Sequence, residues 1–267
     1  MSISVKTFSS AAEAAQALSS DHAARFMGGG TLVMRAVNAG DQSFNTIVLA
    51  KDATLKQIQQ QGDRIVIGAG VTMSQILASR ELEFLHQVAR AVGGPAIRNM
   101  ATVGGNLFAE HPYGDMTAAL LVLDGSVTMA GGQTAALADF LKTRAREPRA
   151  LVASISIARP QSGVFKFRKV SRVKPKGVSL MTIAAWVPQS GGRIHDARVA
   201  YSSMGPTPMR VPAVEQALEG ASLDEAGIAN ALAAATSGLE PPTDAISSSW
   251  YRKEVAPVHL KRALLGR

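Results

Sequence analysis

Two glycine-rich loops decide the fold of this chain: Gly28-Gly29-Gly30-Thr31 and Thr102-Val103-Gly104-Gly105-Asn106. Each loop follows an apolar stretch and offers consecutive backbone N–H groups with no side chain in the way. Such a backbone approaches a pyrophosphate closely, because glycine adds no Cβ and successive N–H groups form a concave anion site. Together the two loops predict a dinucleotide held between two lobes.

The prediction of a dinucleotide site depends more on the second loop than on the first. Gly-Gly-Gly-Thr alone is typical of a flexible turn, and without G-x-G-x-x-G a Rossmann site is disfavoured. Around the second loop, however, Arg98-Asn99 precedes the glycines and Asp115 follows them. Threonine hydroxyls and glycine amides suit a pyrophosphate, whereas Asn106 and Asp115 suit ribityl or ribose hydroxyls.

The composition limits the chemistry that the chain can perform. Its 267 residues, 46% of them hydrophobic, are enough to bury a full core in two or three small lobes. The absence of cysteine excludes structural disulfides, thiolate nucleophiles, zinc–thiolate sites and iron–sulfur clusters ligated by this chain. No apolar run is long enough to span a bilayer and residues 1–10 lack a secretory signal pattern, so we expect a cytoplasmic protein.

A formal net charge of +8 fits an anionic cofactor, an acidic protein partner or nucleic acid. Basic residues gather in residues 142–149, 166–176 and 252–267. Only three Tyr and two Trp are available to stack on bases, and no cluster interleaves aromatic with basic residues. The sequence therefore favours a cofactor or a protein partner over nucleic acid.

Residues 1–53 alternate between strand and helix patterns. Strands are predicted at residues 4–8, 25–27 and 46–49. A helix capped by Ser9 or Ser10 runs through Leu18, with Glu13 placed for a capping box, and a second helix opens at Thr31 and runs to about Val37. This order favours a small parallel sheet whose second crossover begins at the first glycine loop.

A different lobe begins at residue 54, where residues 56–61 and 64–68 flank Gly62-Asp63 and predict a β-hairpin. The other predicted elements of this lobe are a helix from Thr72 or Ser74, helices over residues 82–92 and 115–123, and strands over residues 126–129 and 151–157.

Residues 159–163, Arg-Pro-Gln-Ser-Gly, are the best linker candidate. Beyond this linker, strand patterns at residues 164–170, 180–187 and 193–201 predict an antiparallel sheet, followed by helices from Val211.

Seven segments of the sequence together resemble the motifs of a known protein family. The first four are Phe26-Met27-Gly28-Gly29-Gly30-Thr31-Leu32, Ile67-Gly68-Ala69-Gly70-Val71-Thr72, Ile97-Arg98-Asn99-Met100-Ala101-Thr102-Val103-Gly104-Gly105-Asn106 and Pro112-Tyr113-Gly114-Asp115. Further along lie Lys169-Val170-Ser171-Arg172, Gly205-Pro206-Thr207-Pro208-Met209-Arg210 and Trp250-Tyr251-Arg252 with Lys261-Arg262-Ala263-Leu264. In content and order they resemble the FAD-binding subunit of the xanthine dehydrogenase and carbon monoxide dehydrogenase family of molybdenum hydroxylases.

The resemblance implies an α+β fold in two domains. A two-lobed PCMH-type FAD-binding domain would cover residues 1–160, with lobes of about residues 1–53 and 54–160. Its first lobe would be a small parallel α/β unit and its second a mainly antiparallel sheet with helices. A C-terminal domain of the carbon monoxide dehydrogenase flavoprotein type, an antiparallel sheet and a helical segment, would cover residues 161–267.

The resemblance also implies the medium subunit of a heterotrimeric oxidoreductase. This subunit would bind FAD non-covalently, while a small partner carries [2Fe–2S] clusters and a large partner carries the molybdenum–pterin cofactor. It would pass electrons from the clusters to an external acceptor, within a dimer of heterotrimers and without nucleic acid or membrane insertion. The missing cysteines agree with this division of labour.

The implied site residues bind the cofactor, and none is catalytic or holds a metal. The two loops would hold the pyrophosphate, Asp115 a sugar or ribityl hydroxyl, and Lys169 would either approach the flavin or lie on the solvated surface. The full set is Met27, Gly28, Gly29, Gly30, Thr31, Leu32, Ala101, Thr102, Gly104, Gly105, Asn106, Asp115 and Lys169.

Two departures from the family pattern leave alternatives open. Leu32 stands where relatives often have Asp or Asn, and Gly177 stands where they often have an acidic residue. A structural assembly subunit that has lost FAD is therefore one alternative, and a stand-alone flavin oxidoreductase is another. Among the histidines, only His111, beside the second loop, has a claim to the site.

Overall fold

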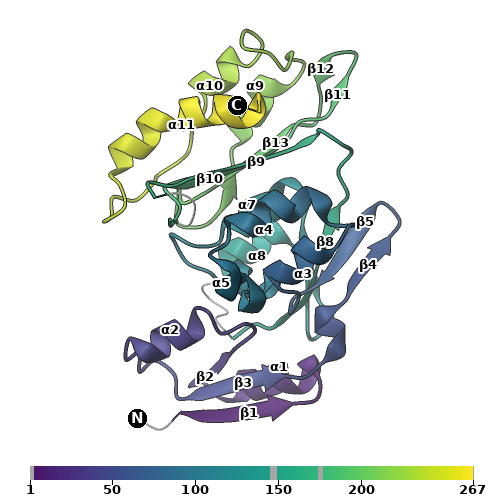
Figure 1. The fold of residues 1–267 in the computed structure, drawn as a ribbon, viewed down its shortest axis with the longest axis vertical. Coiled ribbons are helices and arrows are strands. Elements are labelled where there is room, and N and C mark those ends of the chain that lie inside the picture. The colour runs from purple at the N-terminus through teal and green to yellow at the C-terminus, as the bar shows by residue number, and fades with distance from the viewer. Residues whose placement is uncertain (1–2, 145–148, 174–176, 267) are drawn as a thin grey trace. The chain divides into compact units, whose positions relative to one another are not determined.

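The computed structural model describes residues 3–144, 149–173 and 177–266 of the chain (Figure 1). Parts of the three predicted basic segments, Lys174-Pro175-Lys176 among them, lie outside the described residues. The chain divides into two compact units. Unit 1 consists of Met1–Glu83, Val92–Ala109 and Asp124–Arg159, and unit 2 of Phe84–Ala91, Glu110–Leu123 and Pro160–Arg267.

Unit 1 begins with a three-stranded sheet in the order β1–β3–β2 (Figure 1). The strands are β1 (Ser4–Phe8), β2 (Ala24–Phe26) and β3 (Thr46–Ala50). Both pairings are parallel, with β3 in the centre. The predicted small parallel sheet is therefore confirmed.

Helix α1 (Ala11–Ser20) connects β1 to β2. The Ser10 hydroxyl accepts the N–H of Glu13 at 3.2 Å, and the Glu13 carboxylate accepts the N–H of Ser10 at 3.3 Å. This is the predicted capping box, in which two N–H groups left free at the helix start are satisfied. Ala14 and Leu18, one turn apart, are fully buried against the sheet.

A second sheet of unit 1 has five antiparallel strands in the order β4–β5–β8–β6–β7. The predicted hairpin of residues 56–61 and 64–68 is present, and Ile67 of β5 faces Ile155 of β8 in the register. Strand β7 was not predicted, because its three residues are all exposed and show no alternation. The bounds are β4 (Ile58–Gln61), β5 (Arg64–Gly68), β6 (Ser126–Met129), β7 (Thr134–Ala136) and β8 (Val152–Ala158).

The helices of unit 1 are short. Thr72 caps α3 with its side chain, as expected from the sequence. Pro95 opens α5, where the missing N–H of proline costs nothing. The bounds are η1 (Ala53–Lys56), α2 (Val33–Asn38), α3 (Met73–Ala78), α5 (Pro95–Met100), α6 (Val103–Leu107) and α8 (Leu137–Thr143).

Unit 2 is built on a four-stranded antiparallel sheet in the order β14–β13–β10–β9. This confirms the predicted antiparallel sheet followed by helices. The strands are β9 (Phe165–Val170), β10 (Met181–Trp186), β13 (Arg198–Ser202) and β14 (Met209–Arg210).

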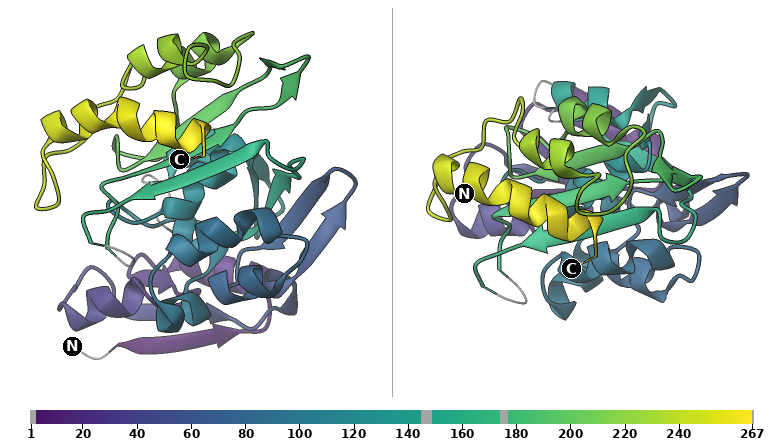
Figure 2. Two further views of the ribbon diagram at one scale, coloured as in Figure 1. Left: turned by 45° about the horizontal axis from the view of Figure 1, so that its top comes forward. Right: turned by 90° about the horizontal axis from the view of Figure 1, so that it is seen from above.

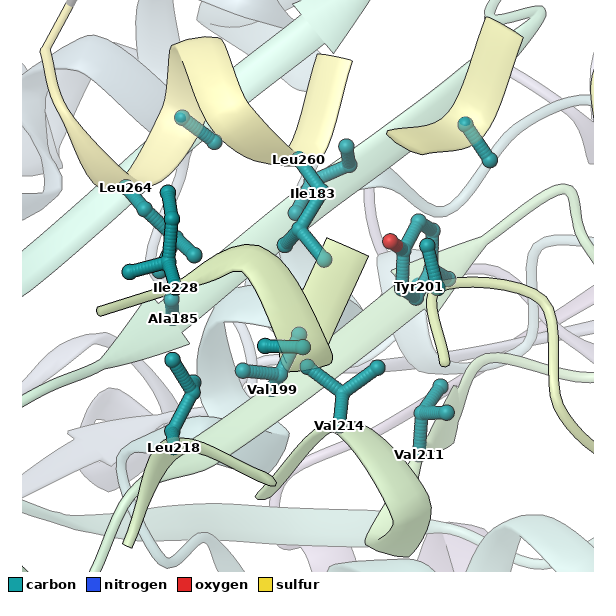
Figure 3. Packing of buried hydrophobic residues seen from close by; sticks show 14 of the residues in the cluster. Ile183, Ala185, Val199, Tyr201, Val211, Val214, Leu218, Ile228, Leu260 and Leu264 are labelled. Carbon is teal, nitrogen blue, oxygen red and sulfur yellow. The ribbon is translucent and has the colours of Figure 1, made fainter. Parts of the chain in front are cut away.

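Helices cover both faces of the unit 2 sheet. Helix α7 (Asp115–Val122), all of whose residues are buried, packs on β10 and β13. Figure 2 shows the long yellow helix α11 (Ser249–Leu264) lying along β9 and β10. With α9 (Pro212–Leu218) and α10 (Ala229–Ala233), it encloses a core to which the sheet contributes Ile183, Ala185, Val199 and Tyr201 (Figure 3).

Two predicted elements of this region differ in the structure. The helix expected over residues 82–92 is a 3₁₀ turn, η2 (Glu83–Leu85), followed by α4 (His86–Ala91), a common way for a helix to start. The single strand expected over residues 193–201 is broken. Gly191 and Gly192, with φ of 57° and 75°, fold β12 (Arg193–Ile194) back onto β11 (Gln189–Ser190), and β13 starts only at Arg198.

Candidate cofactor-binding site

The first glycine loop of unit 1 continues directly from β2. The N–H of Met27 still donates to Val48 in the central strand, at 3.0 Å. After it, none of the N–H groups of residues 28–32 finds an acceptor within the part of the chain that the structure describes. Residues 28–32 are partly or fully exposed, so this run of N–H groups is open to a ligand.

Gly29 shows why the loop is made of glycine. A Cβ on Gly29 would lie 1.6 Å from the carbonyl oxygen of Met100, and one on Gly28 would lie 3.0 Å from the Thr102 hydroxyl oxygen. Gly30 has a φ of +74°, a region that other residues rarely adopt. The two glycine-rich segments, far apart in the sequence, therefore lie backbone against backbone in unit 1.

The second segment differs from the prediction in its hydrogen bonding. It is not an open loop but the start of helix α6, with Thr102 as the N-cap. The N–H of Val103 donates to Val71 at 2.9 Å and that of Gly104 to Ala69 at 2.8 Å. The N–H of Gly105 donates to the Thr102 hydroxyl at 3.0 Å.

The prediction that this segment offers a row of free amides is therefore wrong. Its glycines serve close packing instead, since a Cβ on Gly104 would lie 2.7 Å from the Cβ of Ala69. Ala101 and Thr102 are buried, and the Ala101 carbonyl accepts the N–H of Met73 at 3.0 Å. The second segment is thus hydrogen-bonded and closely packed within unit 1, next to the first loop, and Asn106 lies at its half-exposed end.

The helix that follows the first loop starts later than the sequence predicts. The sequence predicts a helix opening at Thr31, but α2 begins at Val33 and has six residues. Leu32 occupies the N-cap position without a side-chain cap, since leucine has no acceptor to offer. The free N–H groups of residues 28–32 therefore belong to the turn before the helix.

Asp115 and Lys169, the remaining predicted site residues, form a buried ion pair in unit 2. The Lys169 ammonium donates to the Asp115 carboxylate at 2.7 Å and to the Ala91 carbonyl at 2.9 Å. The side chains are 13% and 8% exposed, so Lys169 is not on the solvated surface. The Asp115 carboxylate also accepts the hydroxyls of Thr182, at 2.6 Å, and Ser179.

Sequence reasoning missed these two hydroxyl residues, and also Ser202, whose hydroxyl donates to the Gly114 carbonyl at 3.3 Å. The strand register brings these residues together. Lys169 pairs with Thr182, and Thr182 pairs with Ser202, so the three residues form one row across β9, β10 and β13. A register of this kind is a tertiary feature that local patterns do not reveal.

His111, the one histidine with a claim to the site, is held by other groups of unit 2. Its Nε2 lies 2.5 Å from Asp244 Oδ2, and the buried Arg252 guanidinium donates to both oxygens of the same carboxylate. Burial by itself would raise the pKa of Asp244, but the hydrogen bonds from His111 and the backbone N–H groups of Ser247 and Ile246 outweigh it and hold the pKa well below its usual range.

The departure at Gly177 has a steric reason. A Cβ at this position would lie 2.4 Å from the carbonyl oxygen of Val173, so a larger residue would not fit there without a shift of the backbone. The N–H of Gly177 donates to the same oxygen at 2.8 Å.

Comparison with known proteins identifies the fold and the family. The model of the FAD-binding domain in molybdopterin dehydrogenases matches residues 2–160, and that of the C-terminal domain of carbon monoxide dehydrogenase flavoproteins matches residues 166–266. The chain belongs to the family defined by the FAD-binding domain of molybdopterin dehydrogenases. Its class as an oxidoreductase subunit with an FAD-binding domain, expected from the sequence motifs, is confirmed.

Relatives match this chain in sequence along most of their length. The carbon monoxide dehydrogenase medium chain of Afipia carboxidovorans is 28% identical over 78% of this chain and 75% of its own length. The glyceraldehyde dehydrogenase medium chain of Sulfolobus acidocaldarius is 26% identical, over 72% of this chain and 70% of its own.

A solved carbon monoxide dehydrogenase from Hydrogenophaga pseudoflava, which lacks the Mo-pyranopterin moiety of its cofactor, superposes with a TM-score of 0.92. The match covers 99% of this chain and 96% of the other, at 22% identity, and confirms the predicted α+β fold. Among the described residues, no helix is long and apolar enough to cross a membrane.

Proposed function

We propose that this chain is the FAD-carrying electron-transfer subunit of a heterotrimeric molybdenum hydroxylase. When bound, FAD supplies the redox chemistry, which links the [2Fe–2S] clusters of a partner to an external acceptor. Family membership and the medium-chain relatives support this role. The task of this chain is then to bind and orient the cofactor.

The observation that carries the proposal is the open run of N–H groups at residues 28–32. Backbone N–H groups suit the oxygens of a pyrophosphate, and charge-assisted hydrogen bonds of this kind are short and strong. Gly29 keeps the run in place, because its backbone lies against Met100 where no side chain fits. The residues present therefore fit the diphosphate of FAD.

The other predicted contacts remain part of the proposal. Met27 would lie directly before the open amides of residues 28–32, Thr31 and Leu32 would contribute two of these amides, and Ala101, Thr102, Gly104, Gly105 and Asn106 would line the site from the second segment. Asp115 and Lys169 would serve the ribityl and flavin part of the cofactor. A buried ammonium group such as that of Lys169 is a fixed positive charge, which favours the anionic form of a reduced flavin.

The proposed partners follow from the medium-chain relatives. The resemblance to the molybdenum hydroxylase family implies that a small subunit carries the clusters and a large one the molybdenum–pterin cofactor, and the absence of cysteine in this chain agrees with that. We expect a dimer of such heterotrimers, located in the cytoplasm. The domain division at about residue 160 and the two lobes before it also stay predictions.

The test is the colour of the purified chain. We expect a yellow protein that binds FAD saturably and is bleached only when the partner subunits and their substrate are added. A chain that stays colourless with excess FAD would be a structural assembly subunit instead. A chain that is bleached by a substrate without partners would be a stand-alone flavin oxidoreductase.

A further inference from the structure

Two methionine side chains of unit 1 pack around Gly30, in the turn that carries the free N–H groups of residues 28–32. Relative to the place that a Cβ on Gly30 would take, the Sδ atom of Met27 is 3.1 Å away and the Cγ atom of Met34 is 3.6 Å away. Met34 also donates its N–H to the Gly30 carbonyl at 2.9 Å. The turn at Gly30 is therefore flanked by two thioether side chains.

Both methionines are accessible to small reagents in water. Met34 is 40% exposed, and helix α2, to which it belongs, buries none of its residues. Met27 is half-buried. Met73, in α3 of the same unit, is fully buried and serves as a reference. Because an oxidant has to reach the sulfur atom, we expect Met34 and Met27 to be oxidised before Met73.

Oxidation converts the methionine thioether into a polar sulfoxide. With hydrogen peroxide, the sulfur gives an electron pair to one peroxide oxygen and the O–O bond breaks. That oxygen forms the S–O bond, its proton passes to the other oxygen, and water leaves. Reactions with dioxygen, including its reduction to hydrogen peroxide, belong to the chemistry of flavins. The oxidant is therefore of a class that a flavoprotein encounters.

A sulfoxide oxygen at Met27 or Met34 would lie beside N–H groups that lack an acceptor. The N–H groups of residues 28–32 have none within the described part of the chain. A strong acceptor on the same chain competes with a pyrophosphate for these donors, and its partial negative charge repels the anion. Oxidation thus acts on the same N–H groups that would bind the cofactor.

We propose that Met27 and Met34 form an oxidation-sensitive pair, in which conversion of either residue to its sulfoxide occupies the free N–H groups of residues 28–32 and weakens FAD binding. Methionine sulfoxide reductases reverse the modification. The effect on FAD rests on the proposed function, whereas oxidation of the pair does not.

The experiment compares the purified chain before and after treatment with hydrogen peroxide. Peptide mass spectrometry locates the oxidised methionines, and fluorescence titration gives the dissociation constant for FAD. We expect Met34 to be oxidised well before Met73, and the dissociation constant to rise about tenfold, as for the loss of one hydrogen bond to a charged group. Methionine sulfoxide reductases acting on both sulfoxide epimers should restore the affinity.

The double variant Met27→Leu/Met34→Leu tests which sulfur atoms matter. Leucine keeps the size and the apolar character of methionine but has no sulfur, so treatment should leave the affinity of this variant at its untreated value. Met100→Leu is the matched control. Met100 is 54% exposed, but only its backbone atoms are among those nearest to Gly29. This variant should lose affinity on treatment as the wild type does.

Amide NMR of the oxidised chain without FAD gives a second measurement. The N–H resonances of Gly30 and Thr31 should move downfield, because these groups gain an acceptor. Unshifted resonances in a chain oxidised at Met27 and Met34, or an equal loss of affinity in the double variant, would overturn the inference. If the untreated chain binds no FAD, the proposed function fails and the effect on FAD with it. The amide shifts then still decide whether the sulfoxides occupy the turn.

Discussion

The backbone of Gly29 lies against the carbonyl oxygen of Met100, so closely that a Cβ on Gly29 would be 1.6 Å from that oxygen. The contact joins the turn after β2 to the end of α5 and leaves no room for a side chain at Gly29. It also makes Gly29 the most sensitive position of the candidate site.

Gly29→Ala should therefore impair FAD binding. The methyl group forces the two segments apart, and the loss of one charge-assisted hydrogen bond would weaken binding at least about tenfold. The free energy of unfolding should fall by about 1–3 kcal/mol, as in other overpacked sites. Fluorescence titration with FAD and urea unfolding measure the two effects.

Gly131→Ala is the matched control for this variant. Gly131 is exposed, and a Cβ there meets only the flexible end of the Gln133 side chain. FAD affinity equal in Gly29→Ala and Gly131→Ala would contradict the role given to the Gly29–Met100 contact.

Asp244→Ala should destabilise unit 2. Arg252 is completely buried, and the substitution leaves its guanidinium without the carboxylate that it binds at 3.0 and 3.1 Å. Because the Asp244 side chain is a quarter exposed, we expect a loss of about 3 kcal/mol in the free energy of unfolding, near the lower end for broken buried pairs.

Asp139→Ala is the comparison for Asp244→Ala, because it breaks the exposed pair with Lys142 and should cost less than about 1 kcal/mol. Urea unfolding of both variants gives the two values. Equal losses would mean that burial of Arg252 is unimportant for stability.

The Asp244 carboxylate makes the free energy of unfolding depend on pH. The pKa of Asp244 is lower in the folded chain than its unfolded value, so its contribution is present above the unfolded pKa and is lost as the pH falls through the folded one. Between about pH 5 and pH 3, the wild type should lose more stability than Asp244→Asn. Chemical unfolding at several pH values measures the two slopes, and parallel slopes would refute the assignment.

The capping box of α1 makes a smaller prediction. Ser10→Ala removes the acceptor for the Glu13 N–H and should cost about 1 kcal/mol of unfolding free energy. Ser20→Ala, at the other end of the helix, removes only a hydroxyl bond to Ala17 and should cost less. Thermal unfolding of both variants and of the wild type measures the two losses of stability.

Local patterns predicted much of the fold. Ser10 and Glu13 indicated the start of α1, Gly62-Asp63 indicated the hairpin of β4 and β5, and strand patterns indicated most of the unit 2 sheet. These features depend on residues close together in the sequence. The break before β13 is not evident from the sequence because it depends on positive φ angles at Gly191 and Gly192, beside an otherwise strand-like pattern.

The candidate site was only partly predictable for a related reason. The glycines of both segments stand out in the sequence as predicted pyrophosphate-binding residues, but which N–H groups are free depends on distant carbonyls such as those of Val71 and Ala69. Likewise, the hydroxyls around Asp115 come from residues more than sixty positions further along the chain. Such partners are set by tertiary packing.

The central claim is that the N–H groups of residues 28–32 bind the pyrophosphate of FAD, and amide NMR of the labelled chain during an FAD titration tests it most directly. The account predicts large downfield shifts for these amides and small ones for Val103, Gly104 and Gly105, whose N–H groups already have acceptors. Saturable FAD binding that leaves the amides of residues 28–32 unshifted would contradict it.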